Sequence, residues 1–343
     1  MSDFDVLMAA ELRETPGVVS RQAEVLGPSL RELVRQLRAN PPGFAVTCAR
    51  GSSAHAATFG KYLIERYLGI PVSAAAPSIA TVYKRRLRLD GQLFVAISQS
   101  GRSDDLIEAT ASAKSAGALT AAILNDTEGP LACACDIVLP MAAGQEQSVA
   151  ATKTFVASLT ALLGLIDLWA DLPGLKSALE RLPQRLAQAS HLDWTHAAAA
   201  VAQARSLASL GRGPTLAIAQ EAALKLKEVC DIHAEAFSGA EFQHGPIALV
   251  SPDYPVLIFM PGDKSAQPLQ ALAADLREKQ AMVFTTENGS PPRWYLPVLP
   301  SDCPETDAIC LIQTFYSLAI HLAAHRGVNI DRPRHLKKIT RTR

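Results

Sequence analysis

Short, almost uninterrupted runs of apolar residues recur along the chain, separated by longer amphipathic stretches. In the first half, four such runs have the length and composition of buried strands: residues 44–49, 93–97, 119–124 and 136–140. Between the first two, an expected helix carries Phe59, Leu63, Ile64 and Tyr67 at helical spacing. This alternation indicates an α/β fold, because a parallel sheet is covered by helices on both faces.

The same order of elements returns in the second half. Strands are expected at residues 206–210, 255–260 and 280–286. We therefore predict two tandem, doubly wound parallel-sheet domains followed by a C-terminal active-site tail. The predicted organisation is an N-terminal helical segment at 1–43, a first domain at 44–175, a second at 195–330 and the tail at 331–343.

Charge excludes several classes of partner. The 33 Lys and Arg residues balance the 33 Asp and Glu residues, so no net field favours nucleic acid or an anionic membrane. The N-terminus is acidic and lacks an apolar targeting segment. The stretch nearest to membrane-spanning length, residues 155–170, is interrupted by Ser158, Thr160 and Asp167. We expect a cytoplasmic protein with no membrane or nucleic-acid partner.

The six cysteines are scattered along the chain. Cys133 and Cys135 have no matching second pair and no clustered histidines, which argues against a zinc site. We expect reduced, mostly buried thiols and no metal.

Two polar loops follow predicted strands and precede predicted helices. One contains Ser98, Gln99, Ser100 and Ser103, and the other runs from Arg50 to Ser53. Hydroxyls and free backbone N–H groups at a helix start form a phosphate cradle of neutral donors. The alternative is ordinary helix capping by serine. Arg50 could contact phosphate or be paired in a salt bridge.

One predicted helix carries Glu221, Lys225 and Glu228 at i, i+4 and i+7, which places two carboxylates and an amine on one stripe. His244 follows shortly afterwards, before a Gly-Pro turn. A carboxylate and a histidine could move protons on a small carbon skeleton. The alternative is a solvated, salt-bridged helix face.

Taken together, these motifs resemble the sugar isomerase (SIS) family, in particular the isomerase half of glucosamine-6-phosphate synthase. The resemblance extends over nearly the whole chain and is carried by these matching stretches: residues 98–101, 143–153, 210–213, 221–228, 232–236, 244–246 and 331–338. The resemblance implies two SIS domains, a tail that folds over the site, a sugar-phosphate substrate and no cofactor. It also implies a homodimer in which the His244 loop serves the neighbouring subunit.

The resemblance further implies roles for individual residues. Glu228 would shuttle a proton between C1 and C2, His244 would open the pyranose ring, and Lys338 would reach the ketose carbonyl and could form a Schiff base. The sugar phosphate would be held by Ser52, Ser53, Ser98, Gln99, Ser100 and Ser103. The site would be lined by Glu146, Val149, Glu221 and Lys225.

Departures from the synthases favour a different activity. Position 2 is Ser, where synthases carry the Cys nucleophile of a glutamine-hydrolysing domain, and we expect no such domain. Arg50 stands where synthases usually have Cys, and Gly101 is followed by Arg instead of an acidic residue. These traits resemble stand-alone deaminases, which convert glucosamine 6-phosphate to fructose 6-phosphate and ammonia.

Three alternatives use the same fold. A deglycase would cleave a phosphorylated sugar–amino acid adduct with the same base, and a synthase could use free ammonia or a separate glutaminase subunit. A sugar-phosphate sensor would not need Glu228, His244 and Lys338 together.

Overall fold

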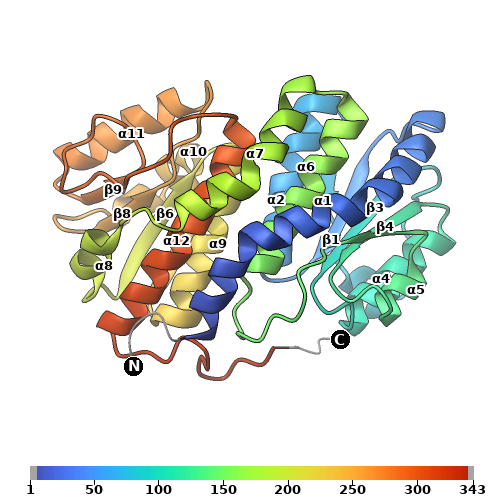
Figure 1. Ribbon diagram of the computed structural model, residues 1–343, viewed down its shortest axis with the longest axis horizontal. Coiled ribbons are helices and arrows are strands. Elements are labelled where there is room, and N and C mark those ends of the chain that lie inside the picture. Colours follow the sequence, from blue (N-terminus) through green and yellow to red (C-terminus); the bar gives the residue numbers. More distant parts are fainter. Residues whose placement is uncertain (1–5, 339–343) are drawn as a thin grey trace. The chain divides into compact units, whose positions relative to one another are not determined.

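The computed structural model describes residues 6–338. Residues 1–5 of the predicted N-terminal segment and 339–343 of the predicted tail lie outside the described residues. The described chain forms two sheets in which all strand pairs are parallel (Figure 1). The predicted α/β class is confirmed.

Sheet A has five strands in the order β2-β1-β3-β4-β5. They are β1 (Ala45–Ala49), β2 (Val72–Ala74), β3 (Leu93–Ser98), β4 (Leu119–Leu124) and β5 (Ile137–Pro140). The four strands predicted in the first half correspond to β1, β3, β4 and β5. The short edge strand β2 was not predicted.

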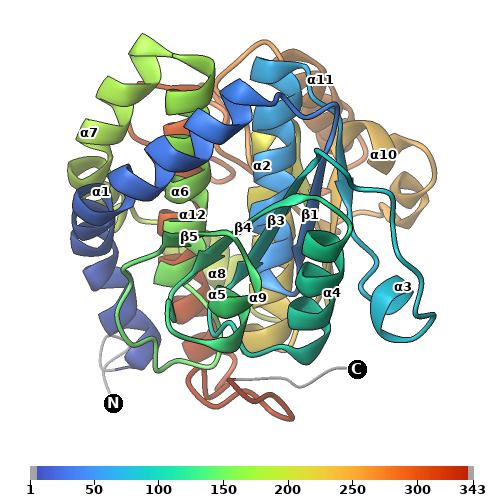
Figure 2. The same cartoon turned by 90° about the vertical axis from the view of Figure 1, so that its right-hand side faces the viewer.

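Helices cover both faces of sheet A. On one face lies α4 (Asp104–Ser115) (Figure 2). Its residues Leu106 and Ala109 pack into a core with Phe94 of β3. The short helices α3 (Ser78–Thr81) and α5 (Pro130–Ala134) contact α4. The helices α2 (Ser52–Leu68) and α6 (Lys153–Ala170) pack against each other, and Gly60 allows α2 to approach Leu162 closely.

Sheet B has four strands in the order β7-β6-β8-β9, matching the order of the first four strands of sheet A. They are β6 (Ser206–Gly211), β7 (His233–Ser238), β8 (Pro255–Ile258) and β9 (Met282–Thr285). Strand β7 was not predicted, because it is an edge strand in which exposed His233 and Glu235 alternate with alanines.

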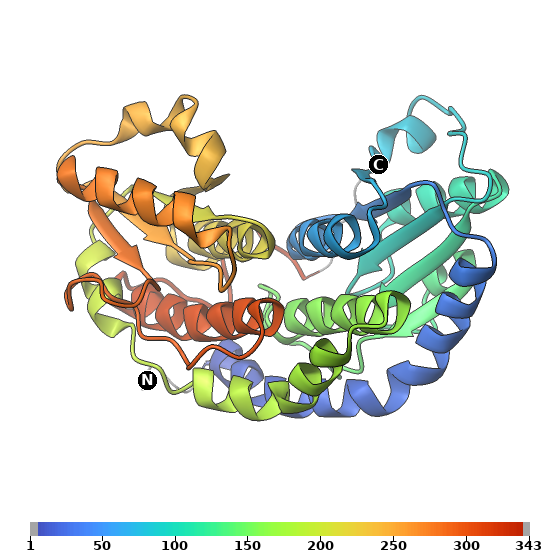
Figure 3. The same ribbon diagram turned by 90° about the horizontal axis from the view of Figure 1, so that it is seen from above.

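The helices around sheet B place the acid/base residues. On one face, α10 (Gly239–Gln243) and α11 (Ala266–Glu278) contribute Phe242, Leu269 and Leu272 to a core with Ile258. α12 (Pro304–His325) packs against α8 (Thr195–Val201) and α9 (Pro214–Cys230), beside sheet B (Figure 3). A single 3-10 turn, Pro246–Leu249, follows α10.

The described residues divide into two compact units. The sheet A unit comprises residues 17–146, 153–180 and 337–338. The sheet B unit comprises residues 6–16, 147–152 and 181–336. Two helices contribute to both units: α1 (Leu7–Ala39) and α7 (Pro173–Ala189). Most of the N-terminal helical segment predicted at 1–43 is therefore one helix, and most of the stretch between the two predicted domains, 176–194, is helical. The predicted domain boundaries stay predictions.

Two described helices, α6 and α12, are long and apolar enough to cross a membrane by length and composition alone. Their most apolar windows are 72% and 78% buried within the protein. This burial is typical of core helices.

Candidate functional site

Both predicted phosphate loops lie at the carboxyl edge of sheet A. One connects β1 to α2 through Gly51, which has a φ of 53° and ψ of −135°. The other connects β3 to α4. Because β1 and β3 are adjacent and parallel, both loops emerge at the edge where open α/β sheets bind ligands. No protein atom lies within 4 Å of where a Cβ on Gly51 would sit, so this turn is open.

Two hydroxyls of the β3–α4 loop are oriented by backbone amides. Ser98 Oγ accepts the N–H of Gly101 at 3.1 Å, and Ser100 Oγ accepts the N–H of Arg102 at 3.3 Å. A hydroxyl that accepts an N–H can still donate its own hydrogen. The loop therefore holds two hydroxyl donors in fixed places.

The serines in these loops do not cap their helices through their side chains. The N-cap of α2 is Gly51, and the N-cap of α4 is Ser103, whose side chain makes no capping hydrogen bond. The capping alternative is therefore wrong for both helices. In the first turns, the N–H of Ala54 donates to the carbonyl of Gly51, and the N–H of Leu106 donates to Ser103 and Asp105. An anion would therefore be bound by the N–H groups that precede these two.

The arginines of both loops are paired with carboxylates. Arg50 contacts Asp105 at 2.8 Å, and Asp105 is 2% exposed. Arg102 contacts Asp126 at 3.0 Å. The salt-bridge alternative for Arg50 is thus the one observed.

Asn125 and Asp126 directly follow β4 and were not among the predicted site residues. Asn125 accepts the N–H of Ala143 at 2.9 Å and donates to the carbonyl of Gly144 at 2.7 Å. It therefore fixes the segment that leads to Glu146. An Asn-Asp pair directly after a buried strand was the available signal.

Lys338 and Glu146 form an ion pair within the sheet A unit. Lys338 Nζ lies 2.7 Å from Oε2 of Glu146, whose side chain is fully buried. Glu146 also accepts the N–H of Thr154 at 3.1 Å and its hydroxyl at 2.8 Å. The amine of Lys153 donates to the carbonyl of Gln145 at 2.7 Å. A predicted lining residue and the predicted carbonyl-binding lysine are thus in direct contact.

The three acid/base candidates of α9 form one cluster in the sheet B unit. Lys225 Nζ lies 3.4 Å from Glu221 and forms a closer ion pair with Glu228. The Glu221 and Lys225 side chains are 0% and 1% exposed, whereas Glu228 is 21% exposed. A solvated helix face is therefore wrong for this stripe. Only Glu228 of the three reaches solvent.

Electrostatics keep Lys225 charged. Burial alone would lower the pKa of this lysine, but the negative charges of Glu221 and Glu228 and hydrogen bonds to both raise the pKa above its ordinary value. The ammonium group therefore stays positive while buried, and its charge is balanced by the two carboxylates beside it.

His244 is exposed, between α10 and the 3-10 turn. Gly245 follows it with a φ of 148°, a conformation that favours glycine. The predicted loop character of this segment is confirmed.

The thirteen predicted site residues are distributed over both units. The sheet A unit contains Ser52, Ser53, Ser98, Gln99, Ser100, Ser103, Glu146 and Lys338. The sheet B unit contains Val149, Glu221, Lys225, Glu228 and His244. Val149 is half-buried in the segment between β5 and α6.

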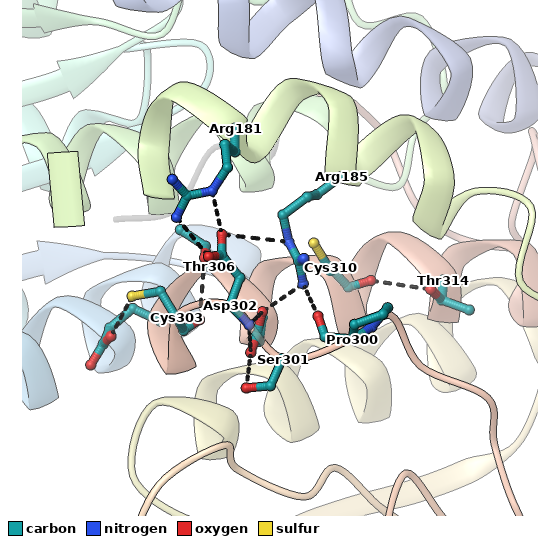
Figure 4. Close-up of polar contacts among 11 residues, drawn as sticks. Arg181, Arg185, Pro300, Ser301, Asp302, Cys303, Thr306, Cys310 and Thr314 are labelled. Atoms are coloured by element: carbon teal, nitrogen blue, oxygen red, sulfur yellow. Dashed lines mark hydrogen bonds and ion pairs between the residues drawn. The ribbon is translucent and has the colours of Figure 1, made fainter. Parts of the chain in front are cut away.

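The sheet B unit also has a cleft of about 230 Å³ with a mixed polar and apolar lining, which was not predicted. Arg185 borders this cleft and contacts Asp307 at 2.7 Å, while Arg181 contacts Asp302 at 2.6 Å (Figure 4). Arg185 also donates to the carbonyl of Pro300 at 2.8 Å. This charge is committed to protein partners, so the cleft lacks the character of an anion site.

Comparison with known proteins gives a consistent result. The family described as "SIS domain" matches residues 45–167 and 200–291, more than half of the chain. A glutamine–fructose-6-phosphate aminotransferase (isomerizing) of Caulobacter vibrioides is 35% identical over 309 residues. That match covers 84% of this chain and 50% of the relative, so the chain spans about half the length of such curated relatives.

Solved structures are similar along their whole length. A protein described as a candidate phosphosugar isomerase from Silicibacter pomeroyi DSS-3 has 42% identity and a TM-score of 0.91, covering 95% of this chain and 100% of that one. A glucosamine-6-phosphate deaminase from Thermotoga maritima has 22% identity and a TM-score of 0.71, covering 96% and 100%. At that identity the second likeness shows the fold alone.

Proposed function

Because this chain belongs to the SIS domain family, we propose that it is a phosphosugar isomerase that deaminates glucosamine 6-phosphate to fructose 6-phosphate and ammonia. The observation that carries the proposal is the buried Lys225 ammonium, held beside one exposed carboxylate on α9. An isomerase needs one base that can reach a carbon-bound proton, and Glu228 fits that role.

The substrate's phosphate would be bound by the two loops of sheet A. Ser98 and Ser100 offer oriented hydroxyl donors, and Ser52, Ser53, Gln99 and Ser103 lie in the same two loops. The helix starts of α2 and α4 add backbone N–H groups without a side-chain cap. Neutral donors suit a phosphate that must also leave with the product.

The chemistry would begin with ring opening. His244 transfers the proton that lets the C1–O5 bond break, giving the open-chain aldehyde. Glu228 then takes the hydrogen from C2, and the electron pair moves into a C1–C2 double bond while O1 gains a proton. A proton delivered to C1 converts this enolamine to an imine at C2.

Ammonia would leave from C2 in one of two ways. Water can add to the imine carbon, after which the C2–N bond breaks. Alternatively, the Lys338 amine attacks C2, ammonia departs, and water hydrolyses the lysine Schiff base. Glu146 would take the proton that the Lys338 ammonium must lose before attack, because the two groups are hydrogen-bonded. Glu221, Lys225 and Val149 would line the reacting carbons.

The test is to incubate the purified protein with glucosamine 6-phosphate and measure ammonia and fructose 6-phosphate. Equal amounts of both products are expected. Parallel reactions use a phosphorylated fructose–amino acid adduct, for deglycase activity, and fructose 6-phosphate with ammonium, for synthesis. Turnover of the adduct but not of glucosamine 6-phosphate would overturn the deaminase assignment. The broader assignment as a phosphosugar isomerase would still stand.

We further propose that the active form is a cytoplasmic homodimer in which His244 serves the neighbouring subunit, as the family resemblance implies. Mixing inactive Glu228→Gln with inactive His244→Ala, refolded together, should then restore activity in mixed dimers. Each mixed dimer should then contain one intact site. Random pairing makes about half of the dimers mixed, so about a quarter of the wild-type activity is expected for the whole mixture. Mixed dimers without activity would place His244 in its own subunit's site.

A further inference from the structure

The first two turns of α1 hold two segments that are distant in the sequence. Asp331, in the C-terminal tail, accepts the N–H of Leu7 at 2.9 Å and of Met8 at 3.2 Å. One turn later, Glu11 accepts the N–H of Ser148 at 3.0 Å and the N–H of Gln147 through a shorter contact. All these residues belong to the sheet B unit.

The Asp331 contact is a helix cap supplied from the other end of the chain. The first turn of α1 contains no acidic residue of its own. A carboxylate at this positive helix end satisfies two N–H groups and interacts favourably with the dipole. Asp331 is in turn oriented by Asn329, whose Oδ1 accepts the N–H of Asp331 at 3.2 Å.

A second contact fixes the same tail further along. Arg334 is paired with Asp231, which ends α9 in a left-handed conformation. Between these two anchors the tail buries Pro333. The segment that leads to Lys338 is therefore held at residues 331 and 334 before it reaches the lysine.

Glu11 has the corresponding effect on the partner of Lys338. Its side chain is buried, at 3% exposure, and it binds the two peptide N–H groups that directly follow Glu146. Asp331 thus anchors the tail that leads to Lys338, and Glu11 binds the peptide groups that directly follow Glu146. Both contacts are made at the first two turns of α1.

We propose that Asp331 and Glu11 are positioning residues that set the placement of Lys338 and Glu146. The inference rests on the proposed function, in which these two groups handle the substrate carbonyl and a proton. Neither positioning residue touches substrate. Their loss should lower kcat and leave phosphate recognition, which belongs to the sheet A loops, nearly unchanged.

The test compares Asp331→Ala, Asp331→Asn and a matched control, Asp193→Ala. Asp193 also accepts a backbone N–H at a helix start, from Thr195 at 2.8 Å, but it lies before α8 and not in the tail. Two quantities are measured on the full-length protein: the deamination kcat and KM, and the rate at which Lys338 is acetylated by an amine reagent, followed by mass spectrometry.

Asp331→Ala should lower kcat by roughly tenfold to a hundredfold with KM changed less than about threefold, as expected for a misplaced group. Acetylation of Lys338 should rise severalfold. Asp331→Asn should recover part of both, because its amide oxygen still accepts an N–H, and Asp193→Ala should match the wild type. Glu11→Ala should repeat the kcat loss, and Glu11→Gln should restore much of it.

Unchanged Lys338 labelling in Asp331→Ala would overturn the inference, and so would faster labelling with unchanged kcat. If the wild type does not deaminate glucosamine 6-phosphate, the proposed function fails. The labelling comparison then still decides whether Asp331 holds the tail.

Discussion

The turn after β1 and the turn after β6 have the same backbone but different uses. Gly51 and Gly213 have φ/ψ values of 53°/−135° and 58°/−136°, and each is followed by a 17-residue helix. With the two glycines aligned, Ser53 corresponds to Thr215. The Thr215 hydroxyl donates to the carbonyls of Arg212 and Phe259 and accepts the N–H of Arg212. The Thr215 hydroxyl thus bonds within the sheet B unit, whereas in sheet A the space beside Gly51 is open.

The helices that follow these two turns, α2 and α9, differ in which of them buries charged residues. In the same alignment, buried Phe59 and Leu63 of α2 correspond to buried Glu221 and Lys225 of α9. A position that supports a hydrophobic core in one helix holds an ion pair in the other. Replacing a buried ion pair with apolar residues is often neutral or stabilising, so the pair in α9 is better explained by chemistry than by stability.

The largest expected effect concerns that ion pair. Lys225→Leu should lower the free energy of unfolding by about 3–5 kcal/mol, because it leaves buried Glu221 without its cation. Urea denaturation measures the change. Glu221→Phe combined with Lys225→Leu copies α2, and should recover most of this stability while remaining inactive. A double variant as unstable as the single one would show that α2 is not a valid guide to α9.

The pH dependence follows from the direction of the lysine shift. The pKa of Lys225 is raised above its ordinary value of 10.5, mainly by two carboxylates that outweigh burial. Its contribution to stability is therefore fully present below that value and is lost as the pH rises through the higher folded pKa. The Lys225→Leu variant leaves the buried Glu221 carboxylate without its cation, which favours uptake of a proton. The loss in free energy of unfolding relative to wild type should therefore be smaller at pH 5 than at pH 8. A deficit that grows as the pH falls would contradict this explanation.

The proposed phosphate-binding role of the β3–α4 loop can be tested with a double variant. Ser98→Ala with Ser100→Ala should weaken binding of fructose 6-phosphate by roughly 1–3 kcal/mol, since each lost donor contributes about 0.5–1.5 kcal/mol. Calorimetry with fructose 6-phosphate and inorganic phosphate measures this loss. Unchanged affinity for both ligands would move the phosphate site away from the β3–α4 loop.

Smaller effects, opposite in kind, are expected for Ser53 and Thr215, which occupy the same position in the two turns. Ser53→Ala should weaken phosphate binding by about 0.5–1.5 kcal/mol and leave the melting temperature unchanged. Thr215→Val should do the reverse, because its hydroxyl bonds are internal. If Thr215→Val also weakened phosphate binding, the assignment of different uses to the two turns would be wrong.

The smallest expected effect is on thiol reactivity. All six cysteines are free, and only Cys133 is exposed. Burial raises the pKa of Cys48, Cys230 and Cys310 to about 12. Iodoacetamide at pH 8 should therefore modify Cys133 first in the native protein, as mass spectrometry can show, with no loss of activity.

The sequence predicted the elements that have strong local patterns and missed those that depend on distant residues. The strands that were predicted bury at least half of their residues. By contrast, β2 spans only three residues and β7 alternates exposed polar residues with alanine. The start of α1 was not predicted, because the residue that caps it, Asp331, lies 324 positions from Leu7.

The same reasoning applies to the candidate site. Spacing on one helix was enough to bring Glu221, Lys225 and Glu228 together. It gave no indication of their burial, which depends on packing in the sheet B unit. The contact of Lys338 with Glu146 joins residues 192 positions apart and could not be predicted from spacing. The pairing of Arg50 with Asp105 was equally undetermined, because either phosphate or a carboxylate could satisfy that arginine.

The most direct test of the central claim is hydrogen exchange at C2 of glucosamine 6-phosphate in deuterated water. The wild type should exchange the C2 hydrogen and release ammonia. Glu228→Gln should lose about 10²–10⁴-fold of the exchange rate while binding fructose 6-phosphate with nearly unchanged affinity, because the amide keeps its shape but cannot accept the proton. Exchange by Glu228→Gln at close to the wild-type rate would contradict the account and assign the base to another residue.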